Sequence, residues 1–302
     1  MTCTGEITAV VLNWRTPELT ERAVRALVAD GVPAERVVVV DNASGDAVAE
    51  RLERELAPSP VTALEENVGF ARGNNRGAES LPGAHYLFVN SDAFVHVPGS
   101  TARLLAALDD PEVGLAVPRL RNEDLTLQPS VVPISTPLPE LVRASGLSRF
   151  VPNRLQPALG THWDHSESRV IQAAIGAVIL VRGSAWDQLG GFDESCFMYG
   201  EDHDLFRRAA GLGWRARFVA EAEFIHLGGG TAEQRWTSPE RAERVARAEG
   251  AMVRDHLGPV SSRITIGLMA AGVGGRALVH RLRGDREAAA TQLAWYRGYR
   301  AR

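Results

Sequence analysis

The segment from Leu87 to Asp92 constrains the fold more than any other stretch, because an apolar run ends there in Asn90-Ser91-Asp92. A continuous apolar run is typical of a strand that is covered on both faces of a sheet. In open α/β sheets, ligands bind beyond the carboxyl ends of such strands. We therefore expect Asp92 to face a ligand, where its carboxylate suits Mg²⁺ or Mn²⁺ beside a nucleotide diphosphate. A turn that caps the following helix explains the same residues equally well.

Composition excludes several classes of protein. The 302 residues are enough to bury a large core, and 45% hydrophobic with 23% charged residues is typical of an ordinary globular protein. A net charge of -4 gives no broad basic field, so no nucleic acid partner is expected. Two cysteines, Cys3 and Cys196, are too few for a disulfide framework. With no signal-peptide pattern and no apolar run of about 18 residues, a cytoplasmic protein is expected.

Apolar runs alternate with segments of helical spacing through the first half of the chain. This pattern predicts right-handed crossovers and an α/β fold, a mainly parallel sheet flanked by helices. The first strand-to-helix turn, Asn13 to Pro17, has no glycine, which weighs against a dinucleotide-binding oxidoreductase or a methyltransferase. Phosphates would then be held another way, and a metal on Asp92 provides one. Strands are expected at 7–12, 37–40, 61–64, 86–89 and 113–117.

The second half is less regular. Repeated prolines between Pro118 and Gln172 indicate either an acceptor-side lid or disorder. A buried strand over 174–181 and a short helix over 183–189 lead to a helix that begins with Glu201 and Asp202. Acidic residues in a first turn stabilise the helix dipole, but a carboxylate fixed there is also well placed to accept a proton from a substrate hydroxyl.

An edge strand is expected to begin at Phe218 and to end near His226. A single histidine after apolar residues is more often structural than functional. The glycines that follow, up to Thr231, predict a loop near the phosphates.

Several blocks resemble inverting nucleotide-sugar glycosyltransferases of glycosyltransferase family 2, which have the GT-A fold. The resemblance covers roughly residues 6 to 230. The blocks are Val10-Val11-Leu12-Asn13-Trp14, Val40-Asp41-Asn42-Ala43-Ser44, Asn67 to Asn75, Asn90-Ser91-Asp92, Gly191-Phe192-Asp193-Glu194, Tyr199-Gly200-Glu201-Asp202-x-Asp204-Leu205 and Gly213-Trp214.

The resemblance implies a role for each matching residue. It makes Asp202 the catalytic base, and it makes Asp92 the metal ligand together with His226. Asn90 departs from the strict D-x-D pattern, which leaves the metal role to Asp92. Each residue also has a structural alternative: Asp41 as a turn residue, Gly69 as a turn cap, and Asn74 as a polar helix residue. The nucleotide-sugar-binding set is Asn13, Asp41, Gly69, Asn74, Asn90, Ser91 and Asp92, and the acceptor side is Glu201, Gly176 and Trp214.

The later blocks also resemble bacterial rhamnosyltransferases of cell-surface glycan synthesis. This resemblance implies dTDP-L-rhamnose as the donor, with UDP-galactofuranose and UDP-glucose as alternatives. The acceptor would be a growing glycan or its polyprenyl-diphosphate carrier. A non-catalytic nucleotide-sugar binding protein is a further alternative, which the Glu201-Asp202 pair disfavours.

The expected organisation is a catalytic domain over 1–235 and a C-terminal helical extension over 236–302. In the first, 1–117 would bind the nucleotide sugar and 118–235 the acceptor. The extension contains a charged helix over 238–256 and an apolar segment over 264–273, followed by basic residues. This pattern fits peripheral contact with the inner face of the cytoplasmic membrane, and it fits equally a helix packed on the domain or in a homodimer.

Overall fold

The computed structural model describes residues 4–131, 135–145, 150, 163–228 and 237–301. Contacts divide the chain into two units, Met1–Val131 with His165–Thr231, and Val132–Asp164 with Ala232–Arg302. The segment 132–164, which the sequence grouped with the acceptor half, therefore belongs to the same unit as the C-terminal helices.

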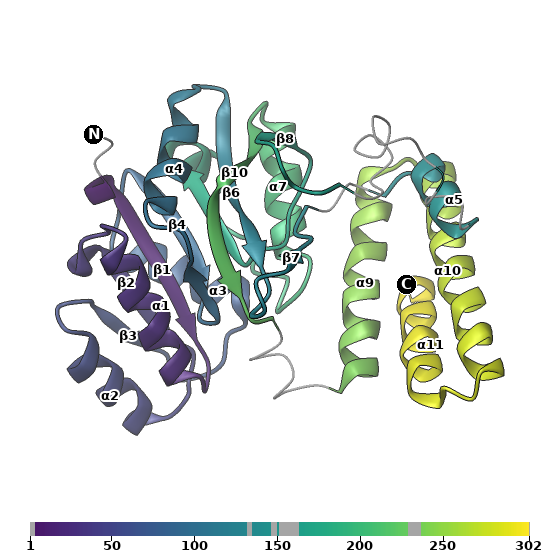
Figure 1. The fold of residues 1–302 in the computed structure, drawn as a ribbon, viewed down its shortest axis with the longest axis horizontal. Coiled ribbons are helices and arrows are strands. Elements are labelled where there is room, and N and C mark those ends of the chain that lie inside the picture. The colour runs from purple at the N-terminus through teal and green to yellow at the C-terminus, as the bar shows by residue number, and fades with distance from the viewer. Residues whose placement is uncertain (1–3, 132–134, 146–149, 151–162, 229–236, 302) are drawn as a thin grey trace. The chain divides into compact units, whose positions relative to one another are not determined.

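The first unit is an α/β layer structure built on one sheet (Figure 1). The sheet order is β3-β2-β1-β4-β9-β6-β10-β5, with β7 on β6 and β8 on β10. Its elements are η1 (Thr4–Glu6), β1 (Ile7–Asn13), α1 (Pro17–Ala29), η2 (Ala34–Arg36), β2 (Val37–Asp41), α2 (Asp46–Leu56), β3 (Val61–Ala63), α3 (Phe70–Ser80), β4 (His85–Asn90), β5 (Ala93–Val95), α4 (Ser100–Ala106), η3 (Ala107–Asp109), β6 (Val113–Arg121), β7 (Leu127–Gln128), β8 (Arg169–Ile171), β9 (Val178–Arg182), α6 (Gly183–Leu189), α7 (Glu201–Gly211) and β10 (Arg215–His226).

Strands β1, β2, β3, β4, β6 and β10 all run in one direction, which confirms the mainly parallel α/β sheet. Two details differ from the expectation. The strand expected over 174–181 begins only at Val178, and β9 runs antiparallel between β4 and β6. The expected edge strand, β10, lies inside the sheet between β6 and β5, so that prediction was wrong. Both features depend on pairing between distant segments, which local patterns do not contain.

The core forms because the central strands are covered on both faces. Every residue of β2 is buried, as the uninterrupted valine run predicted. Helix α3 packs directly on β1 and β2. A Cβ atom at Gly77 would lie 2.3 Å from a Val10 methyl carbon, and one at Gly73 would lie 2.6 Å from a Leu12 methyl carbon. These two glycines therefore let the helix backbone approach the sheet closely.

The second unit contains α5 (Pro137–Ala144), α9 (Ser238–His256), α10 (Pro259–Leu282) and α11 (Arg286–Arg300). The charged helix expected over 238–256 is confirmed, and it starts at a capping box of Thr237 and Glu240. The apolar segment 264–273 lies inside the longer helix α10. Ala246, Val253, Met269, Ala270, Val273 and Tyr299 form the core between these helices. Within the described ranges, no helix is long and apolar enough to cross a membrane.

Candidate active site

The carboxyl ends of three neighbouring parallel strands bring the predicted polar residues to one edge of the sheet. In the register of β1 and β2, Asn13 lies opposite Asp41, and in the register of β1 and β4, Leu12 lies opposite Asn90. Residues that follow these strands therefore meet at the same edge. This is the edge at which we assemble the site.

Asn13 and Asp41 are linked to each other at the tips of β1 and β2. The Asn13 side-chain amide donates to Asp41 Oδ1 at 2.5 Å and to Ser44 Oγ at 3.1 Å. The Ser44 backbone amide donates to Asp41 Oδ2 at 3.0 Å. Both side chains are buried, and these contacts fix the orientation of the Asp41 carboxylate. Ser91 is tied to the same corner, because its hydroxyl lies 3.0 Å from that of Thr16.

The predicted binding residues Gly69 and Asn74 have structural tasks in α3 and its approach. Gly69 has φ +87°, and a Cβ atom there would lie 2.3 Å from the Phe197 carbonyl oxygen. That oxygen accepts the Phe70 backbone amide at 2.8 Å. The Asn74 amide donates to the Phe70 carbonyl of its own helix at 3.0 Å. These contacts agree with the structural alternatives for both residues.

Asn75, which the sequence did not single out, joins the same helix to the loop before α7. Its amide nitrogen donates to the Phe192 carbonyl at 3.0 Å and to Glu194 Oε1 at 3.1 Å. Its amide oxygen accepts the Phe192 backbone amide at 2.9 Å. The loop that leads to the acidic pair is therefore fastened to the nucleotide half of the unit.

Asp92 and His226 converge from two strands, as the resemblance implied. The end of β10 pairs with β5, where His226 lies opposite Ala93, the residue after Asp92. His226 Nε2 lies 3.4 Å from Asp92 Oδ1 and 3.5 Å from the Asn90 amide nitrogen. Both side chains are almost fully buried. A carboxylate oxygen and an imidazole nitrogen thus face the same small space beside β4.

Gln128, on β7, determines which nitrogen of His226 faces Asp92. The Gln128 amide nitrogen donates to the His226 backbone carbonyl at 3.0 Å, and that carbonyl can only accept. The Gln128 amide oxygen therefore faces His226 Nδ1, at 2.7 Å. Nδ1 carries the proton in this bond, so in the neutral ring the lone pair lies on Nε2, the nitrogen that faces Asp92. The sequence analysis missed Gln128.

This donor set fits a divalent ion. A carboxylate oxygen and an imidazole lone pair repel each other unless a cation lies between them. Mg²⁺ and Mn²⁺ accept such a pair when phosphate oxygens and waters complete the coordination. Among the residues that the structure describes, no group of three or more His, Cys, Asp or Glu side chains could hold a metal ion. Asp92 and His226 supply two ligands, which leaves coordination positions for phosphate oxygens and waters.

Asp202 lies in the first turn of α7, where backbone and side-chain donors fix its carboxylate. Oδ2 accepts the Gly176 backbone amide at 2.8 Å, and Oδ1 accepts the His203 backbone amide at 2.8 Å. His203 Nδ1 lies 3.1 Å from Oδ1. Burial opposes ionisation, but the charge of His203 and these hydrogen bonds outweigh it, so the pKa of Asp202 lies below its usual value. The carboxylate is therefore ionised at neutral pH.

Gly176 brings Asp202 to the edge that contains Asp92. A Cβ atom at Gly176 would lie only 3.0 Å from the Asp202 Cβ, so a glycine permits this contact. The next residue, Ala177, accepts the Asn90 backbone amide at 2.9 Å. A continuous chain of contacts thus runs from Asp202 through this backbone to Asn90, and from there to His226 and Asp92.

Glu201 is buried beside Asp202 but in a different environment. Its Oε2 atom has no hydrogen-bond partner among the described residues. Burial and the negative charge of Asp202 raise the pKa of Glu201 well above its usual value. Neighbouring residues on a helix point in different directions, and these two also differ in protonation. Only Asp202 has the charge that a base needs.

Trp214 does not join the other predicted residues. It precedes β10, whereas His226 ends the same strand, so the two lie at opposite edges of the sheet. Its indole nitrogen donates to Gln188 Oε1 at 3.1 Å, and its ring packs on Gly114 at the start of β6. Trp214 therefore packs at the amino ends of these strands.

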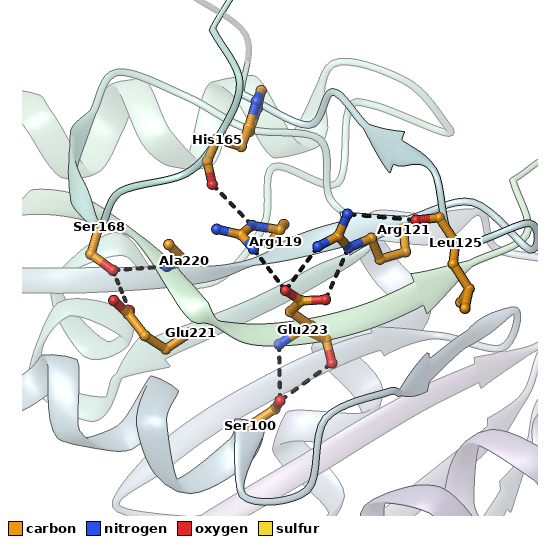
Figure 2. A network of polar contacts seen from close by, with 9 residues as sticks. All are labelled: Ser100, Arg119, Arg121, Leu125, His165, Ser168, Ala220, Glu221 and Glu223. Atoms are coloured by element: carbon orange, nitrogen blue, oxygen red, sulfur yellow. Dashed lines mark hydrogen bonds and ion pairs between the residues drawn. The ribbon is translucent and has the colours of Figure 1, made fainter.

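A polar network supports the end of β10 (Figure 2). The pairing of β10 with β6 is irregular between Val219 and Glu223 and then resumes. There, Glu223 accepts from Arg119 Nη1 at 2.7 Å and from Arg121 Nε at 2.9 Å. Its backbone amide donates to Ser100 Oγ at 2.9 Å. The network fixes the last residues of β10 after the irregularity, and His226 is the final residue of that strand.

Two expectations lie outside the described residues. The phosphate loop was expected to extend through Thr231, but 229–236 are not described. The acceptor-side lid was expected within 118–172, of which 132–134, 146–149 and 151–162 are not described.

Comparison with known proteins gives one family and several relatives. The sequence model of a family described as glycosyltransferase like family 2 matches residues 5–252. An N-acetylglucosaminyl-diphospho-decaprenol L-rhamnosyltransferase of Mycobacterium tuberculosis is 34% identical over 143 residues, which cover 43% of this chain and 42% of the relative. The O-antigen biosynthesis protein RfbC of Myxococcus xanthus is 28% identical over 155 residues, 51% of this chain and 12% of the relative. The chain thus spans less than half the length of these relatives.

Solved structures agree on the fold. The mannosyltransferase PcManGT from Pyrobaculum calidifontis, solved with GDP-Man and Mn²⁺, superposes with a TM-score of 0.60 and 16% identity over 97% of this chain and 85% of its own. S. aureus TarS 1-349 with UDP-GlcNAc gives a TM-score of 0.53 and 15% identity over 97% of this chain and 91% of its own. These neighbours are GT-A glycosyltransferases, so the first unit has the GT-A fold.

Proposed function

The chain belongs to the glycosyltransferase-like family 2, and from that premise we propose that it is an inverting, metal-dependent glycosyltransferase. The donor would be a nucleoside-diphosphate sugar. The acceptor would be a hydroxyl of a cell-surface glycan or of a polyprenyl-diphosphate-linked sugar.

The observation that carries this proposal is the row of contacts at the sheet edge. It joins a saturated, ionised carboxylate, Asp202, to a carboxylate and imidazole pair, Asp92 and His226, through the backbone of Gly176 and Ala177. One end has the charge and rigidity of a general base, and the other has the donor set of a metal that binds diphosphate. Inverting transfer of a sugar from a nucleotide uses a base for the acceptor hydroxyl, and a metal is one means of stabilising the departing diphosphate.

The proposed mechanism assigns one task to each end. Asp202 accepts the proton of the acceptor hydroxyl as that oxygen attacks the anomeric carbon. The bond from that carbon to the diphosphate oxygen breaks on the opposite face, which inverts the configuration. Asn13 and Asp41 orient the nucleoside at the tips of β1 and β2. Mg²⁺ or Mn²⁺, when bound at Asp92 and His226, would supply positive charge to the departing diphosphate.

The donor and acceptor are proposed from the relatives. The mycobacterial relative is a rhamnosyltransferase named for a decaprenol-diphosphate-linked N-acetylglucosamine, which supports dTDP-L-rhamnose as the first donor and a lipid-linked acceptor. The GDP-Man and UDP-GlcNAc of the structural neighbours show how widely donors vary on this fold. UDP-galactofuranose and UDP-glucose are therefore the alternative donors to be compared.

We also propose that the second unit brings the enzyme to the inner face of the cytoplasmic membrane as a peripheral protein. A lipid-linked acceptor would require this location. On α10, Val260 is 70% exposed at the start of the helix and Leu282 is 79% exposed at its end. A second copy of the chain is the alternative partner for these helices, and analytical ultracentrifugation without lipid would detect it.

The proposal is tested by calorimetry of nucleotide sugars with and without Mn²⁺, followed by transfer to a synthetic polyprenyl-diphosphate N-acetylglucosamine. We expect dTDP-L-rhamnose to bind most tightly, and only in the presence of Mn²⁺. In Asp92→Ala, tight binding should be lost and Mn²⁺ should no longer change the affinity. Tight binding of another nucleotide sugar would change the proposed donor but not the proposed reaction. If no nucleotide sugar binds in the presence of Mn²⁺, the proposed function is wrong.

A further inference from the structure

The second unit contains a groove that the proposed reaction does not use. It is a cavity of about 750 Å³ that lies between the end of α9, the first turns of α10 and the end of α11. Helix α11 has 15 residues whereas α10 has 24, so α11 does not cover the whole length of its neighbour (Figure 1). Beside the first turns of α10, α11 leaves a cavity that the described residues do not fill.

The groove is basic. Arg254, Arg263 and Arg300 line it, one from each helix, and no acidic residue is among the described residues of its wall. The ion pairs of this unit, within the described ranges, use other cations, such as Arg247, Arg297 and Arg143 with Glu243 and Glu140. Three guanidinium groups around one cavity repel one another, and an anion would relieve this repulsion. Glu249, on α9, accepts a hydrogen bond from the hydroxyl of the wall residue Tyr299 at 2.7 Å.

Two of the three arginines are oriented by their surroundings. The Arg254 Nη1 atom lies 3.5 Å from the position of a Cβ at Gly250, so this glycine leaves room for the guanidinium to fold along α9. Arg300 Nη1 donates to the Tyr296 hydroxyl at 2.8 Å. The Arg300 guanidinium is thus fixed by a hydrogen bond, and Gly250 leaves space for that of Arg254; guanidinium groups of this kind recognise phosphate.

The rest of the groove is apolar and continues onto an exposed apolar surface. Ile266 and Ala270 form part of its wall. Val260 and Ile264, on the same first turns of α10, are 70% and 49% exposed. A ligand that is anionic at one end and apolar at the other would match both parts, which a free phosphate would not.

We propose that this groove binds the phosphate headgroup of an anionic membrane phospholipid, with the acyl chains beside Val260 and Ile264. The inference rests on the proposed membrane contact of the second unit, but it does not depend on the donor or on the reaction. It predicts a specific headgroup site in place of a diffuse attraction between arginines and an anionic surface.

The test is flotation of the full chain with vesicles of phosphatidylcholine alone and of phosphatidylcholine with phosphatidylglycerol. We expect binding only to the anionic vesicles, and we expect the triple variant R254Q/R263Q/R300Q to bind them about tenfold or more weakly. The matched control is R281Q/R283Q/R286Q, which removes the same charge from exposed positions outside the groove and should weaken binding much less. If both variants lose vesicle binding equally, diffuse electrostatic attraction explains the binding and the inference of a groove site is wrong.

A second variant tests the groove without any change of charge. A Cβ at Gly267, in the groove wall, would meet no atom within 4 Å, so Gly267→Trp fills the cavity with little strain. Reduced flotation with unchanged helical circular dichroism is expected, and wild-type flotation would count against the site. If inorganic phosphate, at the same phosphorus concentration as the lipid, fully displaces the chain from the vesicles, the groove is a site for free anions and the lipid assignment is wrong. Nucleotide calorimetry on the same variants should be unchanged, so a failure here is distinct from a failure of the proposed function.

Discussion

Asp92 and Asp202 are two carboxylates at one edge of one sheet, yet their surroundings are opposite. Asp202 accepts hydrogen bonds from the Gly176 and His203 amides, so donors surround it. Asp92 faces the Nε2 atom of His226, which Gln128 turns into an acceptor. Donors keep a carboxylate ionised and oriented, whereas an acceptor opposite a carboxylate requires a cation. The comparison supports the proposal that Asp202 accepts a proton and that Asp92 binds a metal ion.

The largest expected effect comes from breaking the first half of this comparison. Asp202→Asn keeps the size of the side chain but removes the basic function, so turnover should fall by about 10² or more. Donor affinity should change little, because the nucleotide binds at the other strands. Turnover is measured as release of nucleoside diphosphate with acceptor present, and affinity by calorimetry.

Glu201→Gln is the control for that experiment. Glu201 has a raised pKa and, as the neighbour of Asp202 on a helix, does not share its direction, so its amide variant should retain turnover within about tenfold. If Glu201→Gln is inactive and Asp202→Asn is active, Glu201 is the catalytic base and the assignment to Asp202 is wrong. Two active variants would place the base elsewhere.

The second effect concerns the His226 tautomer. Gln128→Leu removes the acceptor of Nδ1–H, and Mn²⁺-dependent nucleotide affinity should fall by about tenfold or more, as for other residues that orient a metal ligand. Gln128→Glu keeps an acceptor at Nδ1 and should stay near wild type. His226→Ala should lose at least as much Mn²⁺-dependent nucleotide affinity as Gln128→Leu.

Calorimetry with and without Mn²⁺ measures these affinities, and electron paramagnetic resonance of bound Mn²⁺ gives a reading independent of the nucleotide. Affinity without metal should be equal in all three variants. Wild-type Mn²⁺ dependence in His226→Ala would remove this residue from the site, and Gln128 with it.

The sequence was sufficient for the strands that carry the nucleotide half. The valine run of β2 and the apolar run before Asn90 are local patterns, and their tips meet because parallel strands share a carboxyl edge. The antiparallel direction of β9 and the interior position of β10 were missed. Both depend on pairing with strands more than 50 residues away, such as Val178 with Val89, which no local pattern reports.

The missed site residues have similar explanations. Gln128 lies in a proline-rich stretch that looked irregular, and it acts on His226 across 98 residues of sequence. Asn74 and Asn75 are adjacent polar residues on one helix, and only the structure shows that the second reaches Phe192. Periodicity places a residue on a face to within about one position, which does not distinguish such neighbours.

The smallest expected effect sharpens the comparison through pH. The raised pKa of Glu201 means that the folded chain binds this proton more tightly than the unfolded chain does. Stability contributed by Glu201 is therefore present below the unfolded pKa, near 4.5, and is lost as pH rises through the folded pKa. Glu201→Gln cannot titrate, so its free energy of unfolding relative to wild type should increase from pH 5 to pH 8 by roughly 1 kcal/mol or more.

Urea unfolding at several pH values measures this difference, and Asp202→Asn supplies the decisive comparison. The Asp202 charge is the second cause, after burial, of the raised pKa of Glu201. Removing this charge should therefore reduce the difference in unfolding free energy between Glu201→Gln and its parent chain. In Asp202→Asn the same Glu201→Gln change should therefore give a shallower pH dependence. A pH dependence that does not change in the Asp202→Asn background would mean that burial alone acts on Glu201. The two carboxyl groups would then be electrostatically independent, and the distinction between them would rest on the burial of Glu201 and on the His203 charge and hydrogen bonds at Asp202.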